Sequence, residues 1–134
     1  MIPLFNDRMV IGVGFMDIDH RHLCDVLDEL MAGIKDGREL EQMHKTISEL
    51  ILYTEQHFER EKAAMQETEY PDRVAHLAGH DGFTRKVAEF QTRARVDDGR
   101  LVLDIVSFIS TWLVAHIMST DRKLGEYLRQ CGRD

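Results

Sequence analysis

The stretch HFEREKAAMQETEYPDRVAHLAGH, residues 57–80, decides the fold. It reads as two helices joined by a central turn, with His57 and Glu61 before the turn and His76 and His80 after it. Each pair is spaced four residues apart, so its members project from one face of their helix. In an antiparallel hairpin, residues equidistant from the turn lie level because both helices rise equally per residue. The two pairs are therefore expected to face each other, as in a metal site.

Apolar residues recur at steps of three and four along most of the chain, which is typical of helices with one buried stripe. We predict helices at residues 18–35, 39–66, 71–95 and 100–129, after an irregular arm at residues 1–16. Gly37 suits the end of the first helix, Pro71 the first turn of the third, and residues 97–99 the last break. Met31 and Leu40 are placed on the buried stripes. Four long helices with short connections predict an all-α, antiparallel up-down-up-down four-helix bundle in a single domain, residues 1–134.

Residues equidistant from the other two turns can be compared in the same way, by their height along the bundle. His20 comes level with His57 across the first turn, and the pair His116 and Asp121 comes level with the histidines of the third helix. Side chains from all four helices therefore converge on one slab of the core, in two layers roughly 6 to 7 Å apart. The converging set is His20, His57, Glu61, His76, His80, His116 and Asp121. Such a set could hold two metal ions that share the carboxylates.

Each of these residues also has a simpler interpretation. A lone histidine on an apolar face is more often a hydrogen-bonded core residue than a ligand, and Glu61 alone could be half of a buried ion pair. Burying two carboxylates and five imidazoles with no Lys or Arg on the same stripes would be costly unless a cation compensates, so the set favours metal. His22 and His44 point away or lie too far along the helix, and we expect both at the surface without a role.

Composition limits the partners and the compartment. The formal net charge of -7 argues against nucleic acid or an anionic membrane as a partner. Cys24 and Cys131 lie far apart without a CxxC motif, so neither a disulfide framework nor a zinc ribbon is predicted, and a reducing cytoplasm fits. The N-terminal residues do not resemble a secretory signal, and we expect that no stretch approaches the uncharged run of about 18 residues typical of a membrane helix.

The seven candidate ligands, in their order and local sequence, resemble the bacterial members of the hemerythrin family. The matching segments are MDIDH with His20, HFEREKAAM with His57 and Glu61, HLAGH with His76 and His80, and WLVAHIMSTD with His116 and Asp121. The resemblance implies a di-iron centre that contains no haem. One iron would take His76, His80 and His116, the other would take His20 and His57, and Glu61, Asp121 and an oxo or hydroxo group would bridge them. The iron with two histidines would keep the open position for dioxygen.

Two residues depart from the family pattern. Phe5 stands about where many relatives have tryptophan, and Asp19 replaces a common glutamine beside the first ligand. These changes concern the packing of the arm and the hydrogen bonds around the ligands, not the ligands themselves. Asp17, one turn before His20, is expected to cap the first helix rather than to orient a ligand.

Apolar residues beside the ligands are candidates for the dioxygen pocket. They are Leu23, Trp112, Leu113 and Ile117. Each also suits an ordinary core position, and the hypothesis assigns the pocket wall to Leu113 and Ile117 in particular. Cys24 is interpreted as a small core residue, with a redox role left open.

The donor set favours reversible dioxygen binding, for storage, delivery or sensing, over an enzyme. Di-iron oxygenase bundles supply mostly carboxylates, whereas this chain supplies five imidazoles and two carboxylates. The alternative is an enzyme at the same centre: a di-iron peroxidase, an oxidase or a nitric oxide reductase. A regulatory module that signals to a partner protein is a further alternative.

Overall fold

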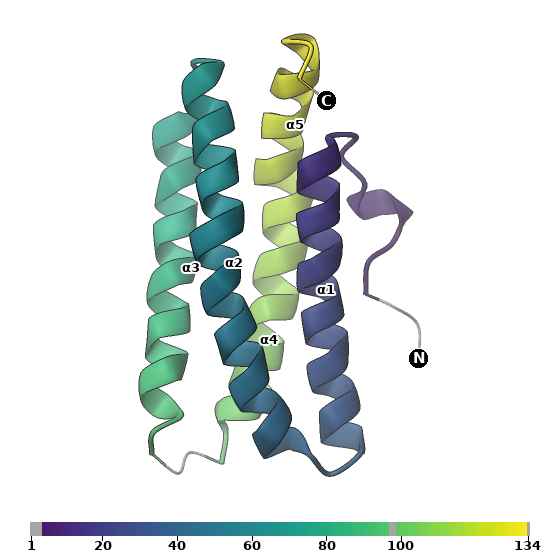
Figure 1. The fold of residues 1–134 in the computed structure, drawn as a ribbon, viewed down its shortest axis with the longest axis vertical. Coiled ribbons are helices and arrows are strands. Elements are labelled where there is room, and N and C mark those ends of the chain that lie inside the picture. Colours follow the sequence, from purple (N-terminus) through teal and green to yellow (C-terminus); the bar gives the residue numbers. More distant parts are fainter. Residues whose placement is uncertain (1–3, 97–98, 134) are drawn as a thin grey trace.

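The computed structural model describes residues 4–96 and 99–133, which form four antiparallel helical rods and a short arm (Figure 1). The elements are η1 (Asp7–Met9), α1 (Gly14–Lys35), α2 (Glu39–Glu67), α3 (Arg73–Arg93), α4 (Leu101–Ala115), η2 (His116–Asp121) and α5 (Arg122–Gln130). The last three follow one another without a break and make up the fourth rod. The predicted all-α, up-down-up-down bundle is confirmed. Residues 1–3 of the predicted arm, and Asp97 and Asp98 of the predicted break, lie outside the described residues.

The arm is shorter than predicted because α1 begins at Gly14 and not at residue 18. Asp17 explains the early start: its carboxylate accepts hydrogen bonds from the backbone N–H groups of Ile11, at 2.8 Å, and Gly12, at 3.0 Å. Asp17 therefore ties the arm to the first turn of α1, and it does not occupy the N-cap position, which belongs to Val13. The expectation that it caps the helix was wrong in that detail.

Two helix ends follow the same backbone pattern. At the end of α1, Gly37 adopts a φ of 75°, and the N–H of Arg38 reaches back to the carbonyl of Gly33 at 2.8 Å. At the end of α2, Glu69 takes the left-handed conformation with a φ of 54°. Such a residue lets the chain leave a helix while pairing its last carbonyls. The second exit falls in the break that was expected between residues 66 and 71.

The third and fourth rods also differ from prediction. Pro71 precedes α3, which runs over Arg73–Arg93 instead of residues 71–95. The fourth rod contains a π-helical segment, η2, where a continuous α-helix over residues 100–129 was predicted. The second rod ends at Glu67, one residue later than expected.

The core fills the space between the four rods, and its largest fully buried side chains include Phe83, Phe90, Met16 and Leu50. Met31 and Leu40 are 43% and 67% exposed, so their predicted burial was wrong. Met31 follows the fully buried Leu30 in α1, so its side chain points about 100° away from that of Leu30. Leu40 lies in the first turn of α2, at the end of the bundle.

One described helical run, Leu101–Gln130, is long and apolar enough by length and composition to cross a membrane. The expectation that no stretch would approach such a run was wrong. Length and hydropathy alone do not distinguish a membrane helix from a core helix of a bundle. In this fold the run supplies the buried His116 and Asp121 to the interior, which is the behaviour of a core helix.

Candidate metal centre

The seven candidate ligands meet in the middle of the bundle. His20 comes from α1, His57 and Glu61 from α2, His76 and His80 from α3, and His116 and Asp121 from the two ends of η2. All seven are buried, and none exceeds 6% exposure. The convergence that the heights of the helices predicted is therefore present in the structure. His22 and His44 are exposed, and His22 lies 3.2 Å from Glu49.

The candidate ligand atoms form two overlapping sets, and the atoms of each set all lie within 4.8 Å of one another. One set contains His76, His80, His116, Glu61 and Asp121, and the other contains His20, His57, Glu61 and Asp121. Glu61 and Asp121 belong to both sets. Two carboxylates shared between two groups of histidines can hold a pair of metal ions.

Each carboxylate divides its two oxygens between the sets. Glu61 Oε1 lies 2.9 Å from His76 Nε2 and 2.8 Å from His80 Nε2, whereas Oε2 lies 2.8 Å from His57 Nε2. Asp121 Oδ1 lies 2.9 Å from His116 Nε2, whereas Oδ2 lies 2.8 Å from His20 Nε2. Every histidine thus presents Nε2 to the centre.

Several of these close contacts do not have the geometry of hydrogen bonds. The Nε2 atoms of His20, His57 and His116, Oε2 of Glu61 and both oxygens of Asp121 are buried without a hydrogen-bond partner among the described residues. Buried polar atoms without partners are rare and costly. These nitrogen and oxygen atoms lie close together without forming hydrogen bonds to one another. Such an arrangement suits a cation that they bind in common. Imidazole nitrogen and carboxylate oxygen are ligands that iron accepts, so the residues fit a di-iron centre.

The electrostatics keep both carboxylates ionised. Burial alone would raise the pKa of Glu61, but the surrounding histidines, His57 first among them, hold it well below its usual value. Burial and the neighbouring Glu61 would likewise raise the pKa of Asp121, and His116 and His20 bring it below its usual value. Burial lowers the pKa of His80, which favours its neutral, metal-binding form.

The π-helix explains how both candidate ligands of the fourth rod face inward. His116 and Asp121 are five residues apart, and in an α-helix that separation would turn them about 140° away from each other. In a π-helix the repeat is wider, so residues five apart come close to one face. The five-residue spacing was visible in the sequence, but its conformational consequence was not recognised there.

Asp19 positions one candidate ligand. Its Oδ2 accepts a hydrogen bond from His57 Nδ1 at 2.7 Å, and Arg60 donates to both oxygens, at 2.8 and 2.7 Å. Burial alone would raise the pKa of Asp19, but the hydrogen bonds from His57 and Arg60 lower it. An ionised acceptor on Nδ1 fixes the imidazole so that Nε2 faces the centre. The sequence drew attention to Asp19 but did not predict this contact.

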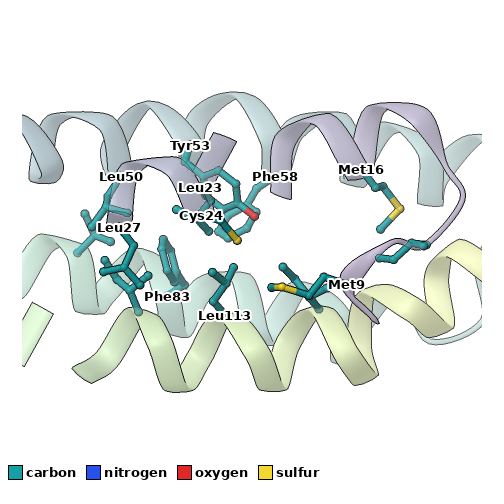
Figure 2. Close-up of a cluster of buried hydrophobic side chains, with 14 of the residues drawn as sticks. Met9, Met16, Leu23, Cys24, Leu27, Leu50, Tyr53, Phe58, Phe83 and Leu113 are labelled. Atoms are coloured by element: carbon teal, nitrogen blue, oxygen red, sulfur yellow. The ribbon is translucent and has the colours of Figure 1, made fainter. Parts of the chain in front are cut away.

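The candidate pocket residues differ in burial and in what they contact. Leu23, Leu113 and Ile117 are buried, and Figure 2 shows Leu113 facing Leu23 and Cys24 across the interior. Trp112 instead stacks on His116, with ring centroids 4.2 Å apart, and so covers the three-histidine side. Phe58 stacks on His80 in the same way, at 3.8 Å.

A surface cavity of about 310 Å³ reaches the three-histidine side. Its lining includes His76, Ser119 and the ion pair between Asp72 and Lys123. The pair joins the start of α3 to α5, so it fastens the fourth rod beside the turn that precedes α3.

Tyr53 is a residue of the site that the sequence reasoning missed. Its ring stacks on His57 with centroids 4.7 Å apart, and its side chain is only 5% exposed. Burial, with Asp121 and Glu61 nearby, raises the pKa of Tyr53 well above its usual value. The signal available in the sequence was its position one helical turn before His57.

Comparison with known proteins identifies the family. The model of the hemerythrin HHE cation binding domain matches residues 11–128, which is most of the chain. The chain belongs to the hemerythrin family. It is 32% identical over 117 residues to a bacteriohemerythrin of Methylococcus capsulatus, covering 87% of this chain and 88% of that protein. A bacteriohemerythrin of Stenotrophomonas maltophilia is 28% identical over 127 residues, with 94% and 81% covered.

Solved structures agree on the fold of this hemerythrin-family chain. One neighbour, a crystal structure of a leucine-to-tyrosine mutant of a hemerythrin, superposes with a TM-score of 0.77. The alignment covers 95% of this chain and 98% of that one, at 23% identity. The likeness therefore extends to the whole bundle, including the rod that carries η2.

Proposed function

We propose that this chain binds dioxygen reversibly at a non-haem di-iron centre, for oxygen storage, delivery or sensing. The observation that carries the proposal is the sharing of Glu61 and Asp121 between two buried groups of histidines. Membership in the hemerythrin family supports the choice of iron as the metal and dioxygen as the ligand.

In this proposal each residue has one role. His76, His80 and His116 would hold one iron, His20 and His57 would hold the other, and Glu61, Asp121 and an oxo or hydroxo group would bridge them. The iron held by two imidazoles has fewer protein ligands, so it is the one that would accept an external ligand. A ferrous pair there would supply the two electrons that dioxygen takes up on binding and returns on release.

The balance of donors supports binding over oxygen activation. Five imidazoles are neutral ligands, and the two carboxylates are the only anions among the seven candidates. Di-iron bundles built mainly from carboxylates place more negative charge on the metal pair. The less anionic set favours a centre that gives up dioxygen unchanged.

Apolar residues near His20 and His116 in the sequence supply the second requirement, the exclusion of water. Leu23, Leu113 and Ile117 are each at most 1% exposed. We propose that these side chains wall the dioxygen pocket, and that Trp112 shields His116 on the other side. A dry pocket limits the proton supply that would turn bound dioxygen into released peroxide.

The test is the absorption spectrum of the iron-loaded, reduced protein as oxygen is added and removed. We expect a visible charge-transfer band that appears with oxygen, disappears on removing it and returns over repeated cycles. Irreversible bleaching, or steady consumption of peroxide or nitric oxide with a reductant, would instead favour a peroxidase, oxidase or nitric oxide reductase.

We also propose a cytoplasmic setting. Cys24 and Cys131 are both free thiols, which fits a reducing compartment. The net charge of -7 does not favour nucleic acid or an anionic membrane as a partner. An oxygen-accepting or signalling protein would have to dock on the outer surface of the bundle.

A further inference from the structure

We propose that the Tyr53 hydroxyl donates a hydrogen bond to the small ligand held on the His20 and His57 side of the centre. The inference rests on the proposed function, because it assigns a residue to the recognition of the same ligand. It adds a polar contact to a pocket whose other walls are apolar.

The ring of Tyr53 is held in a fixed position. It stacks on His57 at an interplanar angle of 21°, and it packs edge-on against Phe58, at 5.3 Å, and Phe83, at 5.9 Å. Aromatic contacts on three sides leave the ring little freedom to turn. The hydroxyl is therefore preorganised and does not have to be ordered when a ligand arrives.

The hydroxyl has no hydrogen-bond partner among the residues that the structure describes. Figure 2 shows it turned into the interior of the bundle, beside the Cys24 sulfur and on the side that faces Leu113. A buried hydroxyl without a partner destabilises a protein, so the presence of one in this aromatic cluster calls for an explanation. A ligand that accepts a hydrogen bond in this space would satisfy it.

The chemistry of the surrounding side chains defines the class of ligand. Leu23 and Leu113 offer no hydrogen bond, and the Cys24 thiol is only a weak donor. A tyrosine hydroxyl favours an acceptor that carries negative charge, because charge-assisted hydrogen bonds are the stronger ones. The pocket should therefore retain small ligands with an anionic terminal atom, such as reduced dioxygen or azide.

The test compares the wild-type chain with Tyr53→Phe, which removes only the hydroxyl. Tyr70→Phe is the matched control, because Tyr70 is also buried beside a ligand histidine, with its ring 6.4 Å from His76 on the opposite side. In Tyr53→Phe we expect azide to bind the diferric protein roughly tenfold more weakly. Dioxygen should also leave the reduced protein faster by a similar factor. The control should match the wild type in both measurements.

The metal-free proteins provide a readout that does not depend on the iron. The unpartnered hydroxyl predicts that metal-free Tyr53→Phe unfolds at the same temperature as the wild type or higher. A clearly lower unfolding temperature would show that the hydroxyl serves the core, and would overturn the inference. Unchanged azide affinity at equal iron content would also overturn it. If the wild type failed to bind dioxygen reversibly, the proposed function would fail, while the azide comparison would still decide the role of Tyr53.

Discussion

Glu61 and Asp121 lie on different rods of the bundle, yet each directs one carboxylate oxygen toward the three-histidine set and the other toward the two-histidine set. Both side chains are fully buried. In the proposed di-iron centre each carboxylate would be common to two metal positions, so the loss of one should affect both ions.

Replacing Glu61 by glutamine should therefore reduce iron binding at both positions. We expect Glu61→Gln to retain at most one iron per chain, because a neutral amide replaces the shared anionic bridge. Glu59→Gln, an exposed change on the same helix, is the control and should bind iron like the wild type. Iron analysis after gel filtration measures the difference. Equal iron contents in the two variants would contradict the bridging role.

Removing the Asp19 carboxylate should weaken metal binding without touching a ligand. Asp19→Ala frees His57 Nδ1, and the loss of such a supporting hydrogen bond typically costs 10- to 100-fold in metal affinity, so about that loss is expected. Arg60→Ala should have a smaller effect, because Arg60 contacts Asp19 and not the imidazole. A competition titration with a metal chelator compares the variants. An Arg60→Ala loss larger than that of Asp19→Ala would contradict this order.

Stability and metal affinity should change in opposite directions with pH. Burial alone would lower the pKa of His57, but Glu61 and Asp19 raise it in the metal-free protein from 6.5 to about 9. The folded chain then binds this proton more tightly than the unfolded chain, so the stabilisation is complete below pH 6.5 and is lost as the pH rises toward 9. The effect is on the order of 3 kcal/mol.

Metal binding needs the neutral imidazole, so iron affinity should rise over the same interval. Urea unfolding of the metal-free protein at several pH values between 6.5 and 8.5 measures the first trend, and a metal titration over the same range measures the second. The lowered pKa of His80 acts mainly below this window and does not reverse the trend. A metal-free protein that became more stable toward pH 8.5 would contradict the account of His57.

Two glycines test how closely the arm packs on the last helix. A Cβ at Gly125 would lie 2.0 Å from Cγ2 of Ile11, whereas a Cβ at Gly82 meets no heavy atom within 4 Å. Gly125→Ala should lower the free energy of unfolding by about 1–3 kcal/mol through overpacking. Gly82→Ala should raise it by about 0.5–1 kcal/mol through helix propensity. Denaturant unfolding of both variants checks the opposite signs, and a harmless Gly125→Ala would show that the arm does not lie against α5.

The apolar wall should protect the reduced centre from oxidation. Leu113→Ala opens space beside the proposed dioxygen pocket, so we expect faster autoxidation of the oxygenated protein. Leu101→Ala, an equally buried leucine at the other end of α4, is the control for general loosening of the core. Each variant should lose about 2–5 kcal/mol of stability. Equal autoxidation rates in both variants would remove Leu113 from the pocket.

The convergence of the ligands could be predicted because helices rise by a constant amount per residue. Spacing from each turn was enough to place His20, His57 and His80 at one height, and the structure brings them into the same interior slab. The π-helix could not be predicted in this way, because a constant rise per residue describes only regular helices. It is the η2 conformation, and not an α-helical face, that turns Asp121 to the centre.

The contacts around the ligands depended on details that a one-dimensional pattern does not contain. Tyr53 and Asp19 act through ring stacking and a hydrogen bond between helices, and neither follows from periodicity. Met31 and Leu40 show that periodicity can also predict burial where there is none. An apolar residue near a buried stripe, or at the end of a rod, can remain exposed.

We propose that this chain holds two iron ions between its four rods. The most direct measurement is an anaerobic titration of the metal-free protein with ferrous ion, followed by iron analysis of the protein after removal of unbound metal. We predict saturation at two irons per chain. A chain that retains no iron, or saturates at one, would contradict the account.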